Sequence, residues 1–265
     1  MGDRVKGKIA GLFGAGQTPG DTIGNGRATA ILLAREGATV IAVDRDLESA
    51  QETARLITGE GGACVEAAAD VVSEADVARV IADVLRDYGR IDILHNNVGA
   101  SLALGDATAT ELETDAFDRL YQVNLRGMWL ACKHVLPAMQ QQGSGSIVNI
   151  SSMAAWEAYP YVGYKTTKAG VIALTQNIAM ANARYGVRAN VILPGLMNTP
   201  MAIEARVAAG TPREEVIAQR DARVPLGRKM GSAWDVAYAS LFLHSDEAKF
   251  ITGVSLPVDG GASVS

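Results

Sequence analysis

The sequence contains few residues of the kinds that bind metals or form disulfides. It has two cysteines, Cys64 and Cys132, and three isolated histidines, with no cysteine–histidine cluster at the spacing of a metal site. Cys64 falls in a predicted strand and Cys132 in a predicted helix. We therefore expect two reduced thiols in the core, and neither a disulfide framework nor a bound metal.

The chain also lacks long apolar runs and long basic runs. No stretch reaches the roughly 18 consecutive apolar residues of a membrane-spanning helix, and the first residues contain no apolar segment typical of a signal peptide. No lysine–arginine tract occurs, and the formal net charge is −5. These features argue against nucleic acid or an anionic membrane as a partner. We expect a cytoplasmic protein that binds a small molecule.

The composition is that of a folded, globular chain. Hydrophobic residues make up 48% of it and charged residues 20%, and 28 residues are glycine. Such a composition is typical of a soluble protein with many tight turns. A length of 265 residues lies within the range of one α/β domain, so we predict a single domain over residues 1–265.

Tyr164 and Lys168 stand four residues apart in a segment, residues 164–185, that has apolar residues at helical spacing. On a helix this spacing places both side chains on one face. A tyrosine phenol titrates near pH 10, and a neighbouring ammonium favours its ionised form, so Lys168 could bring Tyr164 toward neutrality. Upstream, Ser151 and Ser152 could donate to an oxygen that gains charge. In isolation, the pair is more typical of an amphipathic helix with a surface tyrosine and lysine.

A glycine-rich turn follows the first predicted strand, residues 9–13, and precedes a predicted helix, residues 27–36. A strand, such a turn and a helix form a dinucleotide cradle, because glycines let the backbone approach a pyrophosphate and the helix start offers free N–H groups. The loop residues that we expect to contact the cofactor are Gly14, Gly16, Gln17, Gly24, Asn25 and Gly26.

Asp44 ends the second predicted strand, residues 39–43. A carboxylate at this place accepts from a ribose 2′-hydroxyl and repels a 2′-phosphate, so we expect NAD rather than NADP. Arg45 is a complication, because a guanidinium could hold that phosphate. A solvated arginine at a helix start is the simpler interpretation of Arg45.

Predicted strands alternate with predicted helices along the chain. The strands are residues 9–13, 39–43, 63–69, 91–95, 146–150, 188–193 and 255–258, and the helices are residues 27–36, 47–57, 74–88, 115–142 and 164–185. The alternation predicts right-handed crossovers and an α/β fold. We expect a Rossmann-type, doubly wound parallel sheet of about seven strands with helices on both faces.

Ligands on such a sheet bind at the carboxyl ends of the strands. Asp70 and Val71 lie there after the third strand, and Asp70 has the alternative role of N-cap for the next helix. Asn124 lies within predicted helix 115–142, where burial would require partners for its amide. Further candidates follow the fourth, fifth and sixth strands: Asn97, Val98, Gly99, Ser151, Ser152, Pro194, Gly195, Met197 and Thr199.

Residues 199–229 form a charged insertion after the sixth strand. Residues 211–215, Thr-Pro-Arg-Glu-Glu, predict a helix start within it. Two helices at the carboxyl end of a strand are well placed for a substrate lid. The apolar residues Met201, Ile203 and Val207 are equally consistent with ordinary packing.

Together these motifs resemble the classical short-chain dehydrogenases/reductases over nearly the whole chain. Each motif is common, but the combination in this order and spacing is specific. The resemblance is carried by residues 14–26, Asp44, residues 96–99, Asn124, the serines before Tyr164-x-x-x-Lys168, Pro194-Gly195 followed by Thr199, Ile251-Thr252-Gly253 and residues 258–261.

The resemblance implies a catalytic tetrad. Tyr164 would be the general acid or base at the substrate oxygen, and Ser152 would bind that oxygen. Lys168 would lower the pKa of Tyr164 and bind the nicotinamide ribose, and Asn124 would hold a water in a proton relay. The resemblance also implies cofactor contacts by Asn97, Asp70, Val71 and the loop 194–199, and assembly as a homotetramer.

Three features depart from the family pattern. Phe13 replaces the usual threonine before the first glycine. The loop from Gly14 to Gly24 is six residues longer than usual, which leaves open which of residues 17–23 contact the pyrophosphate. Ser152 precedes Tyr164 by one residue fewer than usual; Ser151 restores the count, but the order Asn-Ile-Ser-Ser favours Ser152.

We therefore expect an NAD-dependent oxidoreductase that interconverts a secondary alcohol and a ketone. Met153, Trp156, Tyr159 and Tyr161 suit a small apolar or aromatic substrate, although these aromatic residues are equally suited to packing against another subunit. No cationic residue is obviously aimed at a carboxylate or phosphate of a substrate. The alternative is a catalytically silent NAD(H)-sensing or interaction protein on the same fold.

Overall fold

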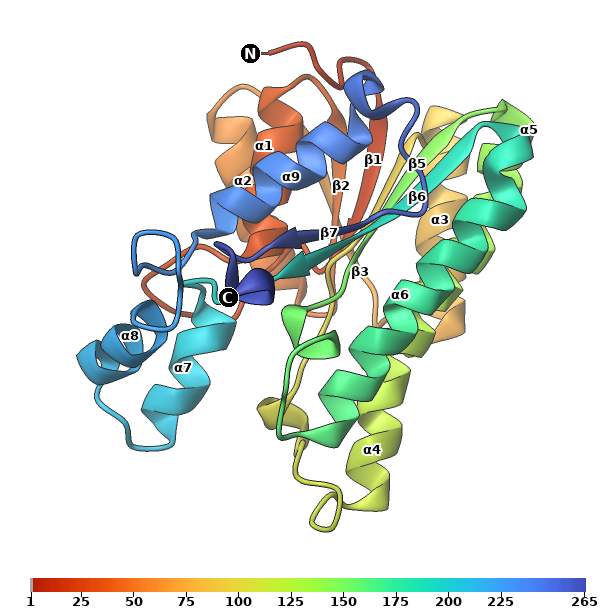
Figure 1. Cartoon of the computed structure of the whole chain (residues 1–265). Helices are drawn as coiled ribbons and strands as arrows, with labels where there is room; N and C mark the ends of the chain where they lie inside the picture. The colour runs from red at the N-terminus through yellow and green to blue at the C-terminus, as the bar shows by residue number, and fades with distance from the viewer. Residues whose placement is uncertain (1) are drawn as a thin grey trace.

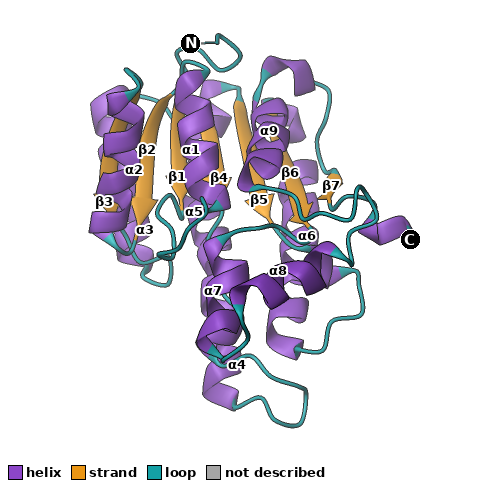
Figure 2. Cartoon of the chain, turned by 90° about the vertical axis from the view of Figure 1, so that its left-hand side faces the viewer, coloured by secondary structure: helices purple, strands orange, loops and turns teal. Residues whose placement is uncertain are grey.

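The structure, a computed structural model, describes residues 2–265. At its centre is a seven-stranded sheet in the order β3-β2-β1-β4-β5-β6-β7, with all neighbours parallel. Figure 2 shows the strands side by side, pointing the same way. The strands are β1 (Ile9–Phe13), β2 (Thr39–Asp44), β3 (Ala63–Ala68), β4 (Ile93–Asn96), β5 (Gly145–Ile150), β6 (Val187–Pro194) and β7 (Ser255–Val258). The predicted doubly wound parallel sheet is confirmed.

Helices cover both faces of this sheet (Figure 1). One face carries α1 (Asn25–Arg35), α2 (Leu47–Gly59) and α9 (Ala233–His244), and the other carries α3 (Glu74–Tyr88), α5 (Gly127–Gln142) and α6 (Val162–Asn182). Beyond the carboxyl ends of the strands lie α4 (Thr114–Tyr121), α7 (Pro200–Ala208) and α8 (Arg213–Asp221) (Figure 2). Within residues 2–265, no helix is both long enough and apolar enough to cross a membrane.

Strand β1 shows how the sequence produces this layering. Its side chains alternate, because Ile9 and Phe13 join the hydrophobic cluster under α3 and α5, whereas Ala10 and Leu12 join the cluster under α1 and α9. A strand covered on both faces must be apolar throughout, and all five residues of β1 are buried. Phe13, which departs from the family pattern, is therefore a core residue.

The strand order changes direction between β1 and β4, the two strands at the centre of the sheet. In doubly wound folds the crevice at this point, outside the carboxyl ends, is where ligands bind. Most of the predicted site residues follow the carboxyl ends of β1, β2, β3, β4, β5 and β6. The topology therefore gathers them along one edge of the sheet.

The segment predicted as one helix, residues 115–142, is interrupted. Helix α4 ends at Tyr121, a π-helical turn covers Gln122–Arg126, and α5 begins at Gly127. The prediction of one continuous helix was wrong, because a π-helical turn adds one residue and leaves the spacing of the apolar residues almost unchanged. Asn124 lies within this turn, and π-helical turns occur frequently at functional sites.

Two other expectations were wrong. Ser73, not Asp70, is the N-cap of α3, and its side chain accepts from the backbone N–H of Asp76. Cys64 is only half-buried, because β3 is an edge strand, whereas Cys132 is buried as expected.

Helix α9 was not predicted. Its start carries a capping box in which Ser232 and Asp235 each bond the other's backbone. The helix is apolar around most of its surface and packs against both the sheet and its neighbour α1, so it lacks the clear one-sided periodicity that marks a surface helix.

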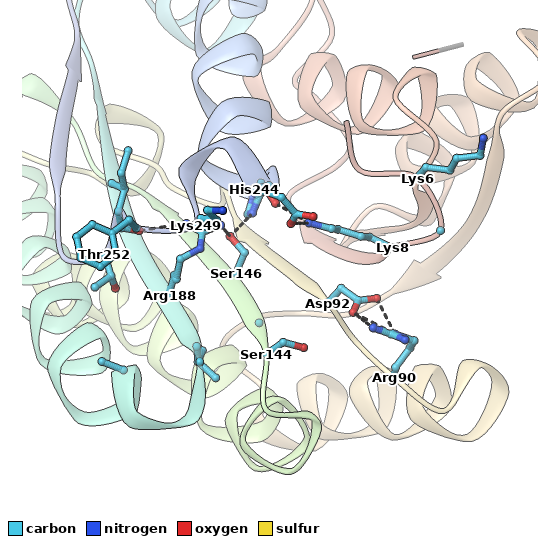
Figure 3. Close-up of a pocket in the computed structure, with 18 residues that line it drawn as sticks. Lys6, Lys8, Arg90, Asp92, Ser144, Ser146, Arg188, His244, Lys249 and Thr252 are labelled. Atoms are coloured by element: carbon cyan, nitrogen blue, oxygen red, sulfur yellow. Dashed lines mark hydrogen bonds and ion pairs between the residues drawn. The ribbon is translucent and has the colours of Figure 1, made fainter. Parts of the chain in front are cut away.

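A cavity of about 760 Å³ opens at the amino ends of β1, β4, β5 and β6 (Figure 3). Lys8 Nζ donates to the carbonyl of His244 at 3.3 Å, and Arg188 Nη2 donates to the carbonyl of Leu243 at 2.7 Å. These cations satisfy the last carbonyls of α9 and complement the negative end of its dipole. The cavity lies at the sheet edge opposite the predicted site, and its basic lining has this structural explanation.

Candidate active site

Helix α6 carries Tyr164 and Lys168 in its first two turns. A loop carboxylate, Asp106, holds the helix start: its Oδ1 accepts from Gly163 N at 2.9 Å and its Oδ2 from Tyr164 N at 3.0 Å. Ser101 Oγ donates to the same carboxylate at 2.9 Å. A carboxylate here satisfies free donors and complements the helix dipole, so Asp106 fixes the position of Tyr164.

Lys168 is a buried lysine, only 2% exposed. Its Nζ donates to the carbonyl of Ile150, at the end of β5, at 2.8 Å, and lies 5.6 Å from the centroid of the Tyr164 ring. Burial lowers the pKa of Lys168 to about 7, because a low-dielectric environment disfavours the ammonium. Lys168 is therefore only partly charged near neutral pH.

The expectation that Lys168 brings the pKa of Tyr164 toward neutrality is contradicted. Burial raises the pKa of Tyr164 to about 12, and a hydrogen bond with Ser152 offsets only part of this effect. The expectation assumed a fully charged ammonium beside the hydroxyl, whereas Lys168 lies over the ring and itself loses charge on burial. The phenol stays protonated at neutral pH, which is the form that can donate a proton.

The two candidate serines have different surroundings. Ser151 is buried, and its Oγ donates to the carbonyl of Lys168 at 2.7 Å, which ties β5 to α6. Ser152 Oγ accepts from Ala154 N at 3.1 Å, and its hydroxyl lowers the pKa of Tyr164. Of the two hydroxyls, that of Ser152 is the one near the phenol.

Asn124 is fully buried and its amide is satisfied. Its Oδ1 accepts from Ala100 N at 2.8 Å, and its Nδ2 donates to Ala100 O at 2.9 Å and to Thr167 Oγ1 at 3.2 Å. The π-helical turn thus joins the loop after β4 to α6. A Cβ added to Gly99 would lie 2.8 Å from Lys168 Nζ and 3.4 Å from Asn124 Oδ1. The four predicted catalytic residues therefore lie close together.

The glycine turn is packed too tightly for larger residues. Gly14 has a φ of +85°, a region that favours glycine. A Cβ on Gly26 would lie 1.9 Å from the carbonyl oxygen of Gly14, so only glycine lets α1 approach the turn this closely. Asn97 Nδ2 donates to that same carbonyl at 3.1 Å, and a Cβ on Gly14 would lie 3.0 Å from Val98 N. The loops after β1 and β4 therefore lie together, as predicted.

Gln17 closes the lengthened loop on itself. Its Oε1 accepts from Gly24 N at 2.9 Å, and its Nε2 donates to the carbonyl of Thr22 at 3.3 Å. Its own backbone N–H donates to Ser49 Oγ at 2.9 Å. Gln17 thus shapes the loop, and its side-chain amide is occupied by loop backbone.

The additional residues of this loop contact the insertion 199–229. Arg213 Nη1, on α8, lies 3.4 Å from Asp21 Oδ2, and its Nη2 lies 2.8 Å from Glu204 Oε2 on α7. A Cβ on Gly20 would lie 2.7 Å from Glu204 Oε1. The loop therefore runs from the turn after β1 to the two helices of the insertion.

The start of α1 suits an anionic group. Its N-cap, Gly24, provides no side-chain hydrogen bond, and its first turn contains no acidic residue, although the first N–H groups of a helix have no partner within it. Asn25 Oδ1 is buried and has no hydrogen-bond partner in the described part of the chain. An uncapped helix start beside a glycine turn fits the pyrophosphate of a dinucleotide. The unsatisfied Asn25 Oδ1, an acceptor, suits a hydroxyl donor of the same ligand.

Asp44 lies beside this turn. Its Oδ2 accepts from Gly16 N at 2.9 Å, and its Oδ1 accepts from Asp46 N at 3.1 Å. A Cβ on Gly16 would lie 2.8 Å from Asp44 Oδ2. Arg45 is exposed and, among residues 2–265, forms no ion pair. The carboxylate is thus fixed at the end of β2, and the guanidinium beside it is not.

The two candidates after β3 differ. Asp70 is exposed, and its Oδ1 accepts from Val72 N at 3.1 Å. Val71 is buried, and a Cβ on Gly127 would lie 2.9 Å from the Val71 Cβ. Val71 is therefore held by packing on the start of α5, whereas Asp70 remains at the rim.

The loop after β6, residues 194–199, packs on other segments. Gly195 N donates to Val258 O at 2.9 Å, and a Cβ on Gly195 would meet Asp259 Cα at 2.7 Å. Met197 is buried, and Thr199 is the N-cap of α7. Within residues 2–265, no hydrogen bond joins this loop, which begins at Pro194, to the four catalytic candidates.

Sequence reasoning missed two residues of the site, Asp106 and Ser101, and it named Tyr159 only as suited to a substrate or to subunit packing. Tyr159 OH lies 3.3 Å from Ser101 Oγ, and its ring centroid lies 5.8 Å from that of Tyr164. Asp106 and Ser101 lie in an irregular loop, where no periodicity marks a buried residue. For Asp106, the absence of a capping side chain next to α6 in the sequence was the available signal.

Comparison with known sequences gives consistent matches. A family model described as enoyl-(acyl carrier protein) reductase matches residues 21–263. The chain is 35% identical over 259 residues to a 3-oxoacyl-[acyl-carrier-protein] reductase of Thermotoga maritima, covering 97% of this chain and 98% of the relative. It is 37% identical over 246 residues to the 2-(R)-hydroxypropyl-CoM dehydrogenase of Xanthobacter autotrophicus, covering 91% and 95%.

Comparison with solved structures agrees. A protein of Burkholderia xenovorans, described provisionally as a short-chain dehydrogenase/reductase, superposes with a TM-score of 0.94 at 42% sequence identity. The match covers 99% of both chains. It therefore includes the whole sheet and the insertion between β6 and α9.

Proposed function

This chain belongs to the short-chain dehydrogenase/reductase family of oxidoreductases, and from that membership we propose that it interconverts a secondary alcohol and a ketone with NAD(H). One observation carries the proposal. Tyr164, Lys168 and Ser152 lie together at the carboxyl edge of the sheet, beside an uncapped helix start and a glycine turn.

The proposed mechanism divides the chemistry between cofactor and protein. A bound nicotinamide would supply a hydride to the carbonyl carbon in reduction and accept it in oxidation. Tyr164, which burial keeps protonated, donates its phenolic proton to the carbonyl oxygen, and Ser152 donates a hydrogen bond to that oxygen. Asn124 holds the loop after β4 against α6. We also propose that Asn124 holds a water in a proton relay, as the family resemblance implies.

We propose NAD as the cofactor because Asp44 is fixed where it would accept from a ribose hydroxyl and repel a phosphate. Lys168 would hold the nicotinamide ribose. The remaining residues proposed to hold the cofactor are Gly14, Gly16, Gln17, Gly24, Asn25, Gly26, Asp70, Val71, Asn97, Val98, Gly99, Tyr164, Pro194, Gly195, Met197 and Thr199.

For the substrate we propose a small molecule with an apolar or aromatic body. The Tyr159 ring lies next to that of Tyr164. Met153, which directly follows Ser152, is buried. We further propose that residues 199–229, which form α7 and α8 at the carboxyl edge of the sheet, act as a lid on this substrate within the single domain 1–265.

The test is turnover of a panel of secondary alcohols and ketones by the wild type and Tyr164→Phe, with NAD and NADP in parallel. We expect Tyr164→Phe to bind NAD normally and to lose about 10² to 10⁴-fold in kcat, because it removes the proton donor. Unchanged turnover in this variant would contradict the mechanism, and faster turnover with NADP would contradict the role of Asp44. Tight NADH binding with no turnover of any compound would favour the catalytically silent sensing protein, which the comparisons do not support.

We also propose a homotetramer. Large aromatic side chains lie exposed on α4, α5 and α9, including Tyr121, Trp129 and Tyr238, and Phe250 is fully exposed near β7. Exposed aromatic surface of this kind is typical of subunit interfaces. The mass in solution, measured by light scattering, would test this assembly. The cytoplasmic location stays a prediction.

A further inference from the structure

Arg220, on α8, is a buried cation without an anionic partner. It is 9% exposed, and among residues 2–265 it forms no ion pair with a carboxylate. Its guanidinium bonds only neutral groups, with Nη2 at 3.4 Å from the carbonyl of Met197 and Nε at 3.2 Å from Met230 Sδ. The carboxylate of the neighbouring Asp221 raises the pKa of Arg220 but accepts from Met230 N instead. Arg213 on the same helix, by contrast, pairs with both Glu204 and Asp21. Burying a charge without a counter-charge costs free energy. Arg220 therefore lacks a bonded anionic group that would stabilise it.

A second guanidinium lies nearby. Arg206, on α7, is partly buried, donates to the carbonyl of Ala202 in its own helix, and forms no ion pair within the described residues. Burial, together with the like charges of Arg206 and Arg223, lowers the pKa of Arg220 to about 10. Arg220 is still a cation at neutral pH. Two arginines of the insertion therefore repel each other where one anion would attract both.

Tyr159 connects these arginines to the proposed reacting centre. Burial raises the pKa of the Tyr159 phenol, and the charge of Arg206 offsets part of this rise. Tyr159 in turn raises the pKa of Arg220. The Tyr159 ring centroid is 5.8 Å from that of Tyr164. The two cations thus lie within electrostatic reach of Tyr159 on the side of the insertion, and Tyr164 is its neighbour on α6.

We propose that Arg220, assisted by Arg206, binds an anionic group at the far end of the substrate, such as a carboxylate, while the carbonyl reacts at Tyr164. This inference rests on the proposed function and narrows the substrate to a keto acid or hydroxy acid with an apolar body. Planar guanidinium groups bind carboxylates bidentately. This site could not be predicted from the sequence, because the arginines belong to a charged segment whose composition indicates full solvation.

The cofactor offers a second source of negative charge, its pyrophosphate. The uncapped start of α1 and the glycine turn already suit that group. Arg220 instead bonds the carbonyl of Met197 and lies against Met230 of the hydrophobic cluster around α7 and α8. Within residues 2–265, no hydrogen bond or ion pair joins Arg220 to the turn after β1 or to α1. We therefore assign the anion to the substrate, and the experiment separates the two sources.

The probes are methyl ketones that end in a carboxylate after two, three or four methylene groups, each paired with its neutral methyl ester. In the wild type we expect kcat/KM for the best carboxylate to exceed that for its ester by about 10- to 100-fold. Arg220→Met should bring this ratio close to one by raising KM for the carboxylate, with kcat for the ester and the Kd for NADH unchanged. Arg220→Lys should retain part of the preference.

Arg223→Met is the matched control, because it removes an exposed arginine two residues beyond the end of α8. The charge of Arg223 acts on Arg220 but is outside the proposed site, so this variant should keep the preference for the carboxylate. A second readout needs no turnover: the carboxylate ketones should raise the melting temperature of the NAD-loaded wild type but not of Arg220→Met. Equal kcat/KM for acid and ester in the wild type, or a loss confined to NADH affinity in Arg220→Met, would overturn the inference. Stabilisation by carboxylates without reduction of any ketone would sustain it while contradicting the proposed function.

Discussion

At the scale of single residues, burial controls the ionisation of the two central side chains. It raises the pKa of Tyr164 to about 12 and lowers that of Lys168 to about 7. Both shifts favour the neutral form, as desolvation requires. The pair is therefore a protonated acid beside a base that is half-charged near neutral pH, and not a phenolate beside an ammonium.

This arrangement predicts the pH profile of ketone reduction. We expect kcat/KM to be highest below pH 7 and to decline above it as Lys168 loses its proton, because kcat/KM reports the ionisation of the free enzyme. Tyr164 should contribute no change until near pH 12. Measured profiles of the wild type and Lys168→Arg would check this, since the guanidinium stays charged and should move the decline to higher pH. A wild-type profile that rises between pH 6 and 8 would contradict it.

At the scale of elements, the site depends on close contacts between segments distant in the sequence. The turn after β1 is held by the loop after β4 through Asn97, and the start of α6 is held by Asp106. Asn124 links the loop after β4 to α6. Small changes at these contacts should disturb cofactor binding and the position of Tyr164 together.

Gly26→Ala tests the contact between α1 and the glycine turn. The new Cβ would lie 1.9 Å from the carbonyl oxygen of Gly14, which is backbone and has to shift. We expect a loss of about 1 to 3 kcal/mol in the free energy of unfolding, as for other overpacked sites, and weaker NAD binding. Denaturant unfolding and NAD titration would measure both effects.

Gly59→Ala is the control for this prediction. Gly59 is an exposed helical residue with nothing within 4 Å of an added Cβ. The substitution should leave NAD affinity unchanged and stabilise α2 by up to about 1 kcal/mol. Equal free energies of unfolding and equal NAD affinities in the two variants would show that the contact between α1 and the glycine turn tolerates a larger residue.

At the scale of the whole molecule, the two ends of the parallel sheet differ in chemistry. The carboxyl end carries the proposed site, and the amino end carries basic residues that cap α9 (Figure 3). Between them, His95 and His244 are fully buried with ring nitrogens 3.2 Å apart, and Ser146 Oγ lies 3.1 Å from the other nitrogen of His244. These histidines join β4, β5 and α9.

The histidine pair predicts acid sensitivity of the fold. Burial lowers the pKa of His95 to about 3 and that of His244 well below its usual value, so both are neutral in the folded chain but take up protons near pH 6.5 when unfolded. Above pH 6.5 the two histidines therefore do not reduce the free energy of unfolding. Below that pH the free energy of unfolding falls, by up to about 1.4 kcal/mol per pH unit for each histidine, because the unfolded chain binds more protons.

Urea unfolding between pH 7.5 and pH 5 would measure this loss, and His95→Phe should reduce the slope by about half. His134→Gln, which changes the partly exposed third histidine on α5, is the control. A wild-type stability that does not change over this pH range would contradict the prediction.

Much of the site could be predicted from the sequence, because its strongest signals are local. The alternation of apolar strands and helices predicted the sheet, and the spacing of Tyr164 and Lys168 predicted a shared helix face. Loop and irregular residues could not be found this way. Asp106 holds α6 from 58 residues before Tyr164 in the chain, and no periodic pattern records a contact of that range.

The sequence by itself determined the order of the elements, the parallel sheet and the identity of the residues at its carboxyl edge, because burial on two faces demands apolar strands and turns demand glycine. Only the tertiary structure decided their ionisation and partners. Charge depends on how much water packing removes, which made Tyr164 more protonated than expected. The same packing buried Arg220 in a segment that composition alone marks as solvated.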